Sequence, residues 1–168
     1  MGEYELGLAS AAGLISSTIL RFHNVYGFPT EFASDRAQVI PSLARKAARH
    51  PDEDFVVWGS GKQRRSFVFV EDVVDALVLG LDRGKNAGPI QIGPAESSSV
   101  SEIALLLAEI SGKGVAPTFD ESKPEGDRDR VGSSALAKQV LGWTPSTSLR
   151  DGLEKTYAWV SDQIVSGR

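Results

Sequence analysis

The 168 residues, 41% of them apolar, suffice for one folded unit with a buried core, and we expect residues 1–168 to form that unit. The 18 basic and 22 acidic residues give a net charge of −4, which provides no overall attraction to nucleic acid or anionic lipid. The lack of cysteine excludes disulfides, thiolate nucleophiles and cysteine-ligated metals. No apolar run is long enough to cross a bilayer and no basic signal segment starts the chain, so we expect a cytoplasmic protein without membrane or nucleic acid partners.

The first half of the chain alternates between helical and extended patterns. Apolar residues from Val39 to Ala47 fall on one face of a helix, which His50 and Pro51 close. Further along, two runs of β-branched and aromatic residues flank a polar, basic connection at 59–65 that is too long for a tight hairpin. The predicted elements are helices at 3–12 and 39–49 and strands at 17–25, 55–58 and 66–70.

The second half has clearer helix boundaries. From Val70 to Leu81 apolar residues recur with the helical period, and Ser99 and Glu102 form the signature of a capping box. Residues 120–132 are the least hydrophobic stretch of the chain, and we expect them to form a long loop. The predicted elements are helices at 70–81, 99–112, 133–141 and 148–164 and strands at 89–93 and 115–119. This alternation predicts an α/β fold.

Most catalytic motifs are missing from the sequence. No stretch reads G-x-G-x-x-G, and no Gly-Lys pair has a glycine five positions before its own, so the Rossmann dinucleotide motif and the P-loop are absent. His23 and His50 are the only histidines, which excludes a histidine-rich metal site and disfavours a Ser-His-Asp triad. We expect His23 to be packed or hydrogen-bonded within its strand and not to act as a general base. The residues alone indicate no catalytic group and no metal ligand.

Cationic side chains provide the positive chemical signal. Arg65 follows the flexible connection, and Arg128 and Arg130 lie in the long charged loop with Lys123 nearby. Guanidinium groups bind phosphate in a bidentate manner, so two of them converging on one diphosphate can hold a nucleotide without a P-loop. The alternative is that these cations pair with the carboxylates of the same loop on a solvated surface. Asn24 stands at the carboxyl end of a predicted strand, where open α/β sheets collect ligands, or else it caps a turn.

Several segments carry a family likeness. They are R-F-H-N-V-Y-G at 21–27, V-I-P at 39–41, W-G-S-G-K-Q-R-R-S-F-V-F-V-E-D-V at 58–73, and L-G-W-T-P at 141–145. In order and spacing they resemble the carboxyl-terminal half of an extended short-chain dehydrogenase/reductase of the NAD-dependent nucleotide-sugar epimerase and dehydratase family. Together with P-E-G-D-R-D-R at 124–130, they are most similar to GDP-mannose 3,5-epimerases. The resemblance implies strands of a partial Rossmann-type sheet together with the small α/β substrate-binding domain.

The resemblance also implies roles for individual residues. Asn24 is expected to hydrogen-bond the substrate near its diphosphate, and Arg65 is expected to clamp the diphosphate. Arg128 or Arg130 supplies the second cation. The residues expected to line the same cleft or to cover the nucleoside base are Gln63, Val39, Ile40 and Pro41.

Some positions depart from the family pattern. Gln38 stands where the epimerases use a lysine, and Ser133 replaces a common aspartate, so the sugar and the base remain open. The catalytic Tyr-x-x-x-Lys pair also has no counterpart, because the fourth residue after Tyr4, Tyr26 or Tyr157 is never lysine. The glycine-rich phosphate loop of the family is missing as well.

The expected function follows from the diphosphate-binding residues that the resemblance implies and from the family motifs that are missing. We expect the nucleotide-diphosphate-sugar binding half of an NAD-dependent epimerase or dehydratase, without catalytic residues or a cofactor site of its own, because NAD belongs to the complete enzyme. Such a chain is expected to be inactive alone. Open strand edges and apolar faces favour association with the missing amino-terminal half or with a second copy in a homo-oligomer. The alternative is a stand-alone, non-catalytic nucleotide-sugar binding or assembly module.

Overall fold

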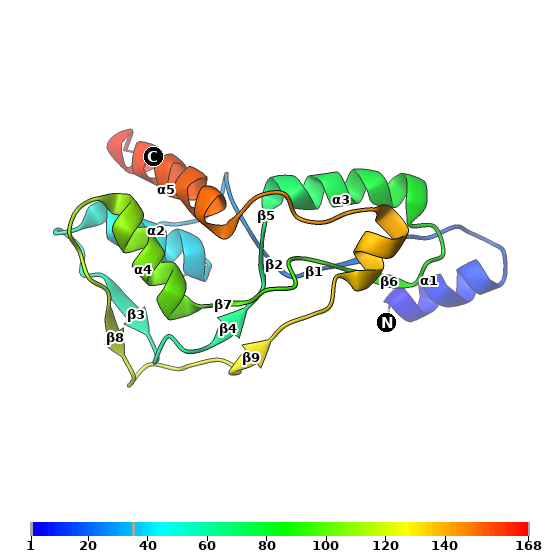
Figure 1. Ribbon diagram of the computed structural model, residues 1–168, viewed down its shortest axis with the longest axis horizontal. Coiled ribbons are helices and arrows are strands. Elements are labelled where there is room, and N and C mark those ends of the chain that lie inside the picture. Colours follow the sequence, from blue (N-terminus) through cyan, green and yellow to red (C-terminus); the bar gives the residue numbers. More distant parts are fainter. Residues whose placement is uncertain (1, 35, 168) are drawn as a thin grey trace.

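The computed structural model describes residues 2–34 and 36–167 as an elongated molecule in which helices and short strands alternate (Figure 1). The helices are α1 (Gly2–Ala11), α2 (Val39–Arg49), α3 (Val70–Arg83), α4 (Val100–Ser111), α5 (Leu149–Val165) and the π-helical turn η1 (Ala137–Leu141). The strands are β1 (Ile19–Phe22), β2 (Asn24–Tyr26), β3 (Val56–Trp58), β4 (Arg64–Arg65), β5 (Phe67–Phe69), β6 (Pro89–Ile92), β7 (Ser98–Ser99), β8 (Thr118–Asp120) and β9 (Asp129–Arg130). The α/β class predicted from the sequence is confirmed. Among the described helices, none has the length and apolar character needed to cross a membrane.

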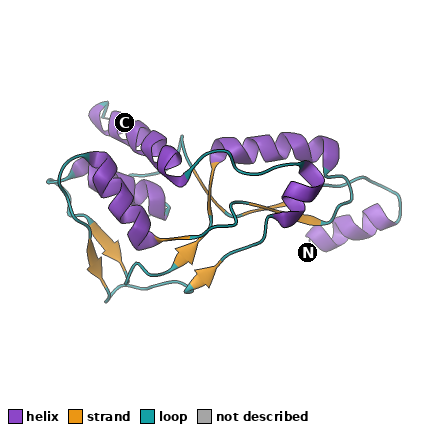
Figure 2. Ribbon diagram, viewed as in Figure 1, coloured by secondary structure: helices purple, strands orange, loops and turns teal. Residues whose placement is uncertain are grey.

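The strands form small sheets, most of them parallel (Figure 2). β1 pairs with β6, β2 with β5 and β3 with β8, each in parallel orientation. The remaining sheet has the order β7-β4-β9, in which β4 runs antiparallel to β7 and parallel to β9. Parallel strands need long crossover connections, and the helices and long loops of the chain provide them.

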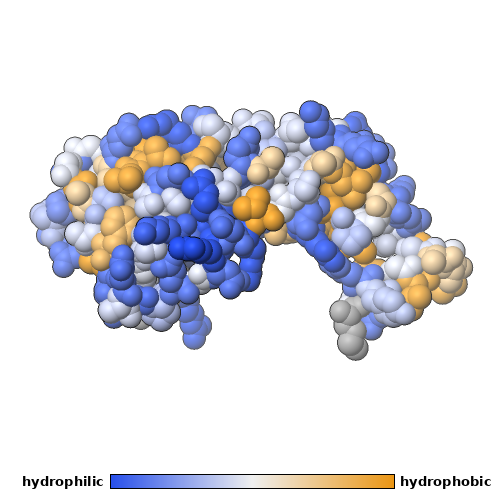
Figure 3. Space-filling view, turned by 60° about the horizontal axis from the view of Figure 1, so that its bottom comes forward, coloured by the Kyte–Doolittle hydropathy of each residue, from blue (hydrophilic) through white to orange (hydrophobic). Residues whose placement is uncertain are grey.

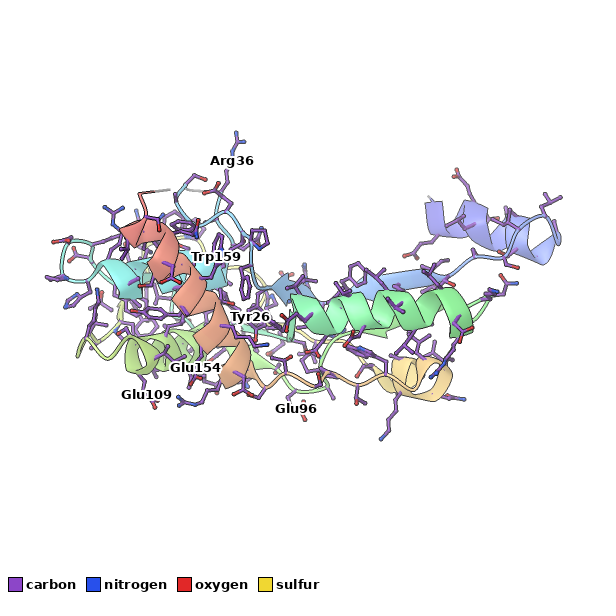
Figure 4. The ribbon with its side chains drawn as sticks, turned by 90° about the horizontal axis from the view of Figure 1, so that it is seen from above. Tyr26, Arg36, Glu96, Glu109, Glu154 and Trp159 are labelled. Atoms are coloured by element: carbon purple, nitrogen blue, oxygen red, sulfur yellow. The ribbon has the colours of Figure 1, made fainter. Side chains whose placement is uncertain are left out.

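Two hydrophobic cores divide the molecule into two lobes. We call the first the helical lobe (α2, α4 and α5 with β3 and β8) and the second the sheet lobe (β1, β6, α3 and η1, with α1 beside them). β2 and β5 join the lobes, because Phe67 and Phe69 pack into the first core and Val68 into the second. Tyr26, at the end of β2, lies where the lobes meet (Figure 4).

The strand predicted at 17–25 is in fact two strands, because the chain changes partner at His23. The His23 N–H donates to a carbonyl of β6 at 2.9 Å, whereas the Asn24 N–H donates to the carbonyl of Ser66 at 3.1 Å. The His23 ring fills the space beside Gly93, where a β-carbon would fall 2.1 Å from its Nδ1 atom. His23 is therefore a packed residue, and the change of partner directs the chain from the sheet lobe towards the helical lobe.

Two connections predicted as loops contain short strands. Residues 59–65 include β4 and residues 120–132 include β9, and the two strands pair with each other. Neither strand shows the alternation of apolar and polar residues by which strands are recognised, because both are short and charged. The helix predicted at 133–141 is π-helical from Ala137 to Leu141, and Gly142 ends it in the left-handed conformation.

Hydrogen bonds near the helix starts fix how the elements meet. The Ser99 Oγ atom accepts from the Glu102 N–H at 3.1 Å and the Glu102 carboxylate accepts from the Ser99 N–H at 2.7 Å, which confirms the capping box. The buried carboxylate of Asp72, at the start of α3, accepts from the N–H groups of Ser146 and Thr147 at 3.0 and 3.1 Å. These bonds hold the segment before α5 against α3 and so tie the two lobes together.

Candidate functional site

The pairing of β4 with β9 aligns two of the predicted phosphate ligands. Its register sets Arg65 opposite Arg130, and residues directly opposite each other in neighbouring strands point to the same face. The Arg64 N–H donates to the carbonyl of Arg128 at 2.7 Å, which holds β9 in this register. The sheet therefore brings Arg65 and Arg130 together, while Arg128 contributes a backbone carbonyl.

Asn24 joins this pair from β2. Its backbone N–H and its side-chain Nδ2 both donate to the carbonyl of Ser66, each at 3.1 Å. Ser66 directly follows Arg65, so Asn24, Arg65 and Arg130 meet where β2, β4 and β9 come together. Asn24 is exposed, and its Oδ1 atom and its second amide hydrogen are available to a ligand.

Surface ion pairing, the alternative for these cations, holds for one of the two aligned arginines. Arg130 pairs with the carboxylate of Asp127, and the side chains of both residues are mostly exposed. Within the part of the chain that the structure describes, Arg65 makes no ion pair, and its guanidinium donates to the carbonyl of Arg64 at 2.7 Å. Exposed pairs are weak, so a phosphate can compete with Asp127 for Arg130.

A cavity of about 290 Å³ lies between α2 and β3, and Gln63, two residues before Arg65, lines it. Its walls come from α2, from β3 and from Pro124 in the long loop. Of the residues predicted to line the cleft or cover a base, Val39 and Gln63 face this cavity. Ile40 and Pro41 are buried in α2 and do not line it.

The cavity also presents polar groups that can recognise a ring. The Gln63 Oε1 atom is buried and accepts no hydrogen bond among the described residues. The Lys46 ammonium donates to the carbonyl of Val56 at 2.6 Å, and burial, followed by the nearby charge of Arg45, lowers the pKa of Lys46. Sequence analysis missed Lys46, although it lies seven residues after Val39 and so on the same helix face.

Comparison with known proteins places the chain in a family. A model described as "NAD dependent epimerase/dehydratase family" matches residues 1–93. The chain belongs to this family. It is 39% identical to GDP-L-fucose synthase 1 of Arabidopsis thaliana over 147 residues, which are 85% of this chain and 45% of that protein. It is 35% identical to GDP-mannose 3,5-epimerase 1 of Oryza sativa subsp. japonica over 150 residues, 89% of this chain and 39% of that protein.

Solved structures superimpose on almost the whole chain. The UDP-glucose 4-epimerase of Thermotoga maritima, solved with UDP-glucose, is 31% identical with a TM-score of 0.86 over 96% of this chain and 51% of that one. The UDP-glucuronic acid 4-epimerase of Bacillus cereus, solved with UDP-glucuronic acid and NAD, is 28% identical with a TM-score of 0.80 over 96% and 50%. The family predicted from the motifs is confirmed, and the chain spans about half the length of the relatives it matches.

Two motifs of NAD-dependent enzymes are absent from the sequence. The sequence has no G-x-G-x-x-G loop to cradle a pyrophosphate, and no tyrosine is followed by lysine at the fourth position. Among the described residues, no group of three or more histidine and carboxylate side chains could hold a metal ion. The chemistry that the site supports on its own is therefore the binding of an anionic ligand with a ring that fits the cavity.

Proposed function

We propose that this chain binds a nucleotide-diphosphate sugar, with the diphosphate at Arg65 and Arg130 and the base in the cavity beside α2. The observation that carries the proposal is the register of β4 and β9, which pairs Arg65 with Arg130, while Asn24 bonds the next residue, Ser66. A diphosphate bound between the two guanidinium groups accepts charge-assisted hydrogen bonds from both. Because Gln63 lines the cavity two residues before Arg65, one ligand can span both parts.

Each side chain has a defined part in this proposal. The guanidinium of Arg65 donates two hydrogen bonds to phosphate oxygens, and Arg130 adds its own once the phosphate displaces its carboxylate partner. Asn24 donates its second amide hydrogen to the same diphosphate. In the cavity, the Oε1 atom of Gln63 accepts a ring N–H of the base, and the ammonium of Lys46 donates to a ring carbonyl. Guanine and uracil both carry these groups.

We further propose that the chain orients the nucleotide sugar but does not convert it alone. The complete enzymes of the family use NAD, which exchanges a hydride with its substrate. The sequence has neither a glycine-rich loop for that cofactor nor the Tyr-x-x-x-Lys pair. Its own residues hold and place the diphosphate and the base, so the reacting sugar has to meet groups from elsewhere.

The partner surface that we propose is the apolar face of the sheet lobe. α1 has no buried residue, and within the described residues β1 pairs with β6 alone, which leaves its other edge open. Apolar side chains are exposed along α1 and α3, and Figure 3 shows apolar surface at the end of the molecule where α1 lies. They are Tyr4, Leu6 and Leu8 on α1 and Val74, Leu77, Val78 and Leu81 on α3. This face fits the cofactor-binding half of the family or, without it, a second copy of the chain.

Calorimetric titration of the chain with GDP, UDP and dTDP tests the binding proposal. We expect binding of at least one of them, and Arg65→Ala should weaken it by about 1.5–3 kcal/mol, or roughly 10- to 150-fold in Kd, because a charge-assisted contact is lost. Arg49→Ala is the control, because it removes the same charge from the far end of α2. Failure of the wild-type chain to bind any of the three, or equal affinities for wild type and Arg65→Ala, would refute the proposal.

A stand-alone, non-catalytic binding or assembly module is the second candidate, because binding at Arg65, Arg130 and the cavity needs no catalytic group. The half-enzyme and the stand-alone module differ in whether adding an NAD-binding half restores turnover. We would mix the chain with the NAD-binding half of a relative such as GDP-L-fucose synthase 1 of Arabidopsis thaliana, together with cofactor and GDP-sugars. Recovered turnover supports the half-enzyme, whereas nucleotide binding without turnover supports the module.

A further inference from the structure

We propose that Glu125 is a positioning residue that holds the segment from Lys123 to Arg130, which we call the strap, across the diphosphate site. The inference rests on the proposed nucleotide binding. The strap lies along residues 58–65 and contacts them at both of its ends. At its start the Lys123 ammonium lies 5.8 Å from the ring centre of Trp58, and at its end β9 pairs with β4.

The carboxylate of Glu125 makes the central contact of the strap. Its Oε2 atom accepts from the backbone N–H of Ser60 and its Oε1 atom accepts from the Ser60 hydroxyl, both at 2.9 Å. Gly59 permits this approach, because its φ of +78° suits glycine and a β-carbon there would fall 3.0 Å from the carboxylate. The two hydrogen bonds from Ser60 lower the pKa of Glu125, so the carboxylate is charged at neutral pH.

The Glu125 contact lies between the two parts of the proposed site. Pro124, on one side of it, lines the cavity. Gly126, on the other side, lies against Arg65, since a β-carbon there would be in van der Waals contact with a guanidinium nitrogen of Arg65, at 3.4 Å. Glu125 is therefore placed to set both the cavity wall and the distance at which Arg130 faces Arg65.

Polar contacts order the strap, among them the pairing of β9 with β4 at its end and the contacts of Glu125 at its centre. Its residues are all exposed, so apolar burial contributes little to holding it in place. Its order depends on polar contacts, and Glu125 makes two of them with one residue. Without these contacts the strap samples more conformations, and a ligand that needs Arg130 must order the segment when it binds. The diphosphate should therefore lose more affinity than the nucleoside part of the ligand.

The test compares wild type, Glu125→Ala and Glu121→Ala by calorimetry with GDP and GMP, and with UDP and UMP in parallel. Glu121 is the matched control, because it removes the same charge from the same loop. We expect Glu125→Ala to weaken diphosphate binding about tenfold and to reduce the preference for the diphosphate over the monophosphate. Ser60→Ala loses one of the two donors and should give a smaller effect, while Glu121→Ala should match wild type.

A second measurement needs no ligand. Trypsin should cut the strap after Arg128 and Arg130 faster in Glu125→Ala than in wild type or Glu121→Ala, with unchanged circular dichroism. Equal cleavage rates, equal loss of mono- and diphosphate affinity, or unchanged diphosphate affinity in Glu125→Ala would each overturn the positioning role. Failure of wild type to bind any nucleotide, with faster cleavage of Glu125→Ala, would instead refute the binding proposal and leave supported the role of the Glu125–Ser60 contact in holding the strap.

Discussion

The two lobes bury their apolar residues to very different extents. In the helical lobe, α2, α4 and α5 pack against one another, and Leu107 and Leu153 are fully buried, although Trp58 of β3 and Phe119 of β8 are exposed. In the sheet lobe, α3 and η1 cover β1 and β6 only in part, since Phe22 of β1 remains 45% exposed. α1 stands apart from the rest of this lobe (Figure 4). More of the large exposed apolar side chains lie in the sheet lobe, with α1 beside it, than in the helical lobe.

The difference bears on where the proposed site can form. Parallel sheets are normally covered on both faces, and the sheet lobe lacks that cover within the described residues. Arg65 and Arg130 come from the β7-β4-β9 sheet, and the cavity that Gln63 lines is walled by α2 and β3 of the helical lobe. We therefore expect the isolated chain to bind the nucleotide even when no partner covers the sheet lobe.

The largest contrast should come from the same substitution made in both lobes. Leu107→Ala, at a fully buried position of α4, should cost about 2–5 kcal/mol of unfolding free energy, because it leaves a cavity. Leu81→Ala, at a position of α3 that is 77% exposed, should change it by less than about 0.5 kcal/mol. Urea unfolding followed by tryptophan fluorescence measures both.

The same pair also tests the proposed partner surface. If Leu81→Ala costs as much as Leu107→Ala, the face of α3 is covered in solution by a second copy of the chain. Unfolding midpoints that rise with protein concentration would confirm that reading. Midpoints that stay constant, together with a small effect at Leu81, mean that the face is open in the isolated chain.

A smaller effect is expected at Asp72, which ties the lobes together. Burial alone would raise its pKa, but hydrogen bonds from Ser146 and Thr147 outweigh burial and bring the pKa below the ordinary value of 3.8. The stabilisation is therefore complete above that ordinary value and is lost as the pH falls through the lower folded value. Asp72→Asn should cost about 1–3 kcal/mol at neutral pH and flatten the acid side of the stability curve. Urea titrations over a pH series measure both, and an unchanged acid slope would contradict the assignment.

Patterns within a short stretch of sequence predicted those elements that are stabilised by contacts within the same stretch. The capping box at Ser99 and Glu102 and the helix of α3 follow from spacing within one turn or one face. β4 and β9 could not be predicted in this way, because each is stabilised by a partner some sixty residues away. The division of the predicted strand 17–25 into β1 and β2 at His23 likewise results from a change of partner strand. No pattern of residues within 17–25 indicates that change.

The site was predictable in its residue types but not in its geometry. The motifs indicated Asn24, Arg65 and Arg130, and the backbone brings them together; their contact with a ligand remains a prediction. The same motifs indicated Ile40, which is buried in the core beneath α2. The family resemblance identifies the segment at the start of α2 as part of the site. Which residues of that segment face the cavity depends on the period of the helix.

The smallest effect is expected in α1, where only exposed contacts hold the helix. Arg21 forms an ion pair with Glu3, and the hydroxyls of Ser10 and Ser17 lie 2.8 Å apart. A helix of 10 residues without a buried side chain is too short to be stable by itself in water. Its amides should therefore exchange almost as fast as in an unfolded peptide, whereas those of α4 stay protected, and Glu3→Gln should leave the unfolding midpoint unchanged. Protection of α1 that appears only on adding a family NAD-binding half would place that partner on the sheet lobe, and protection already present in dilute chain would contradict the open face.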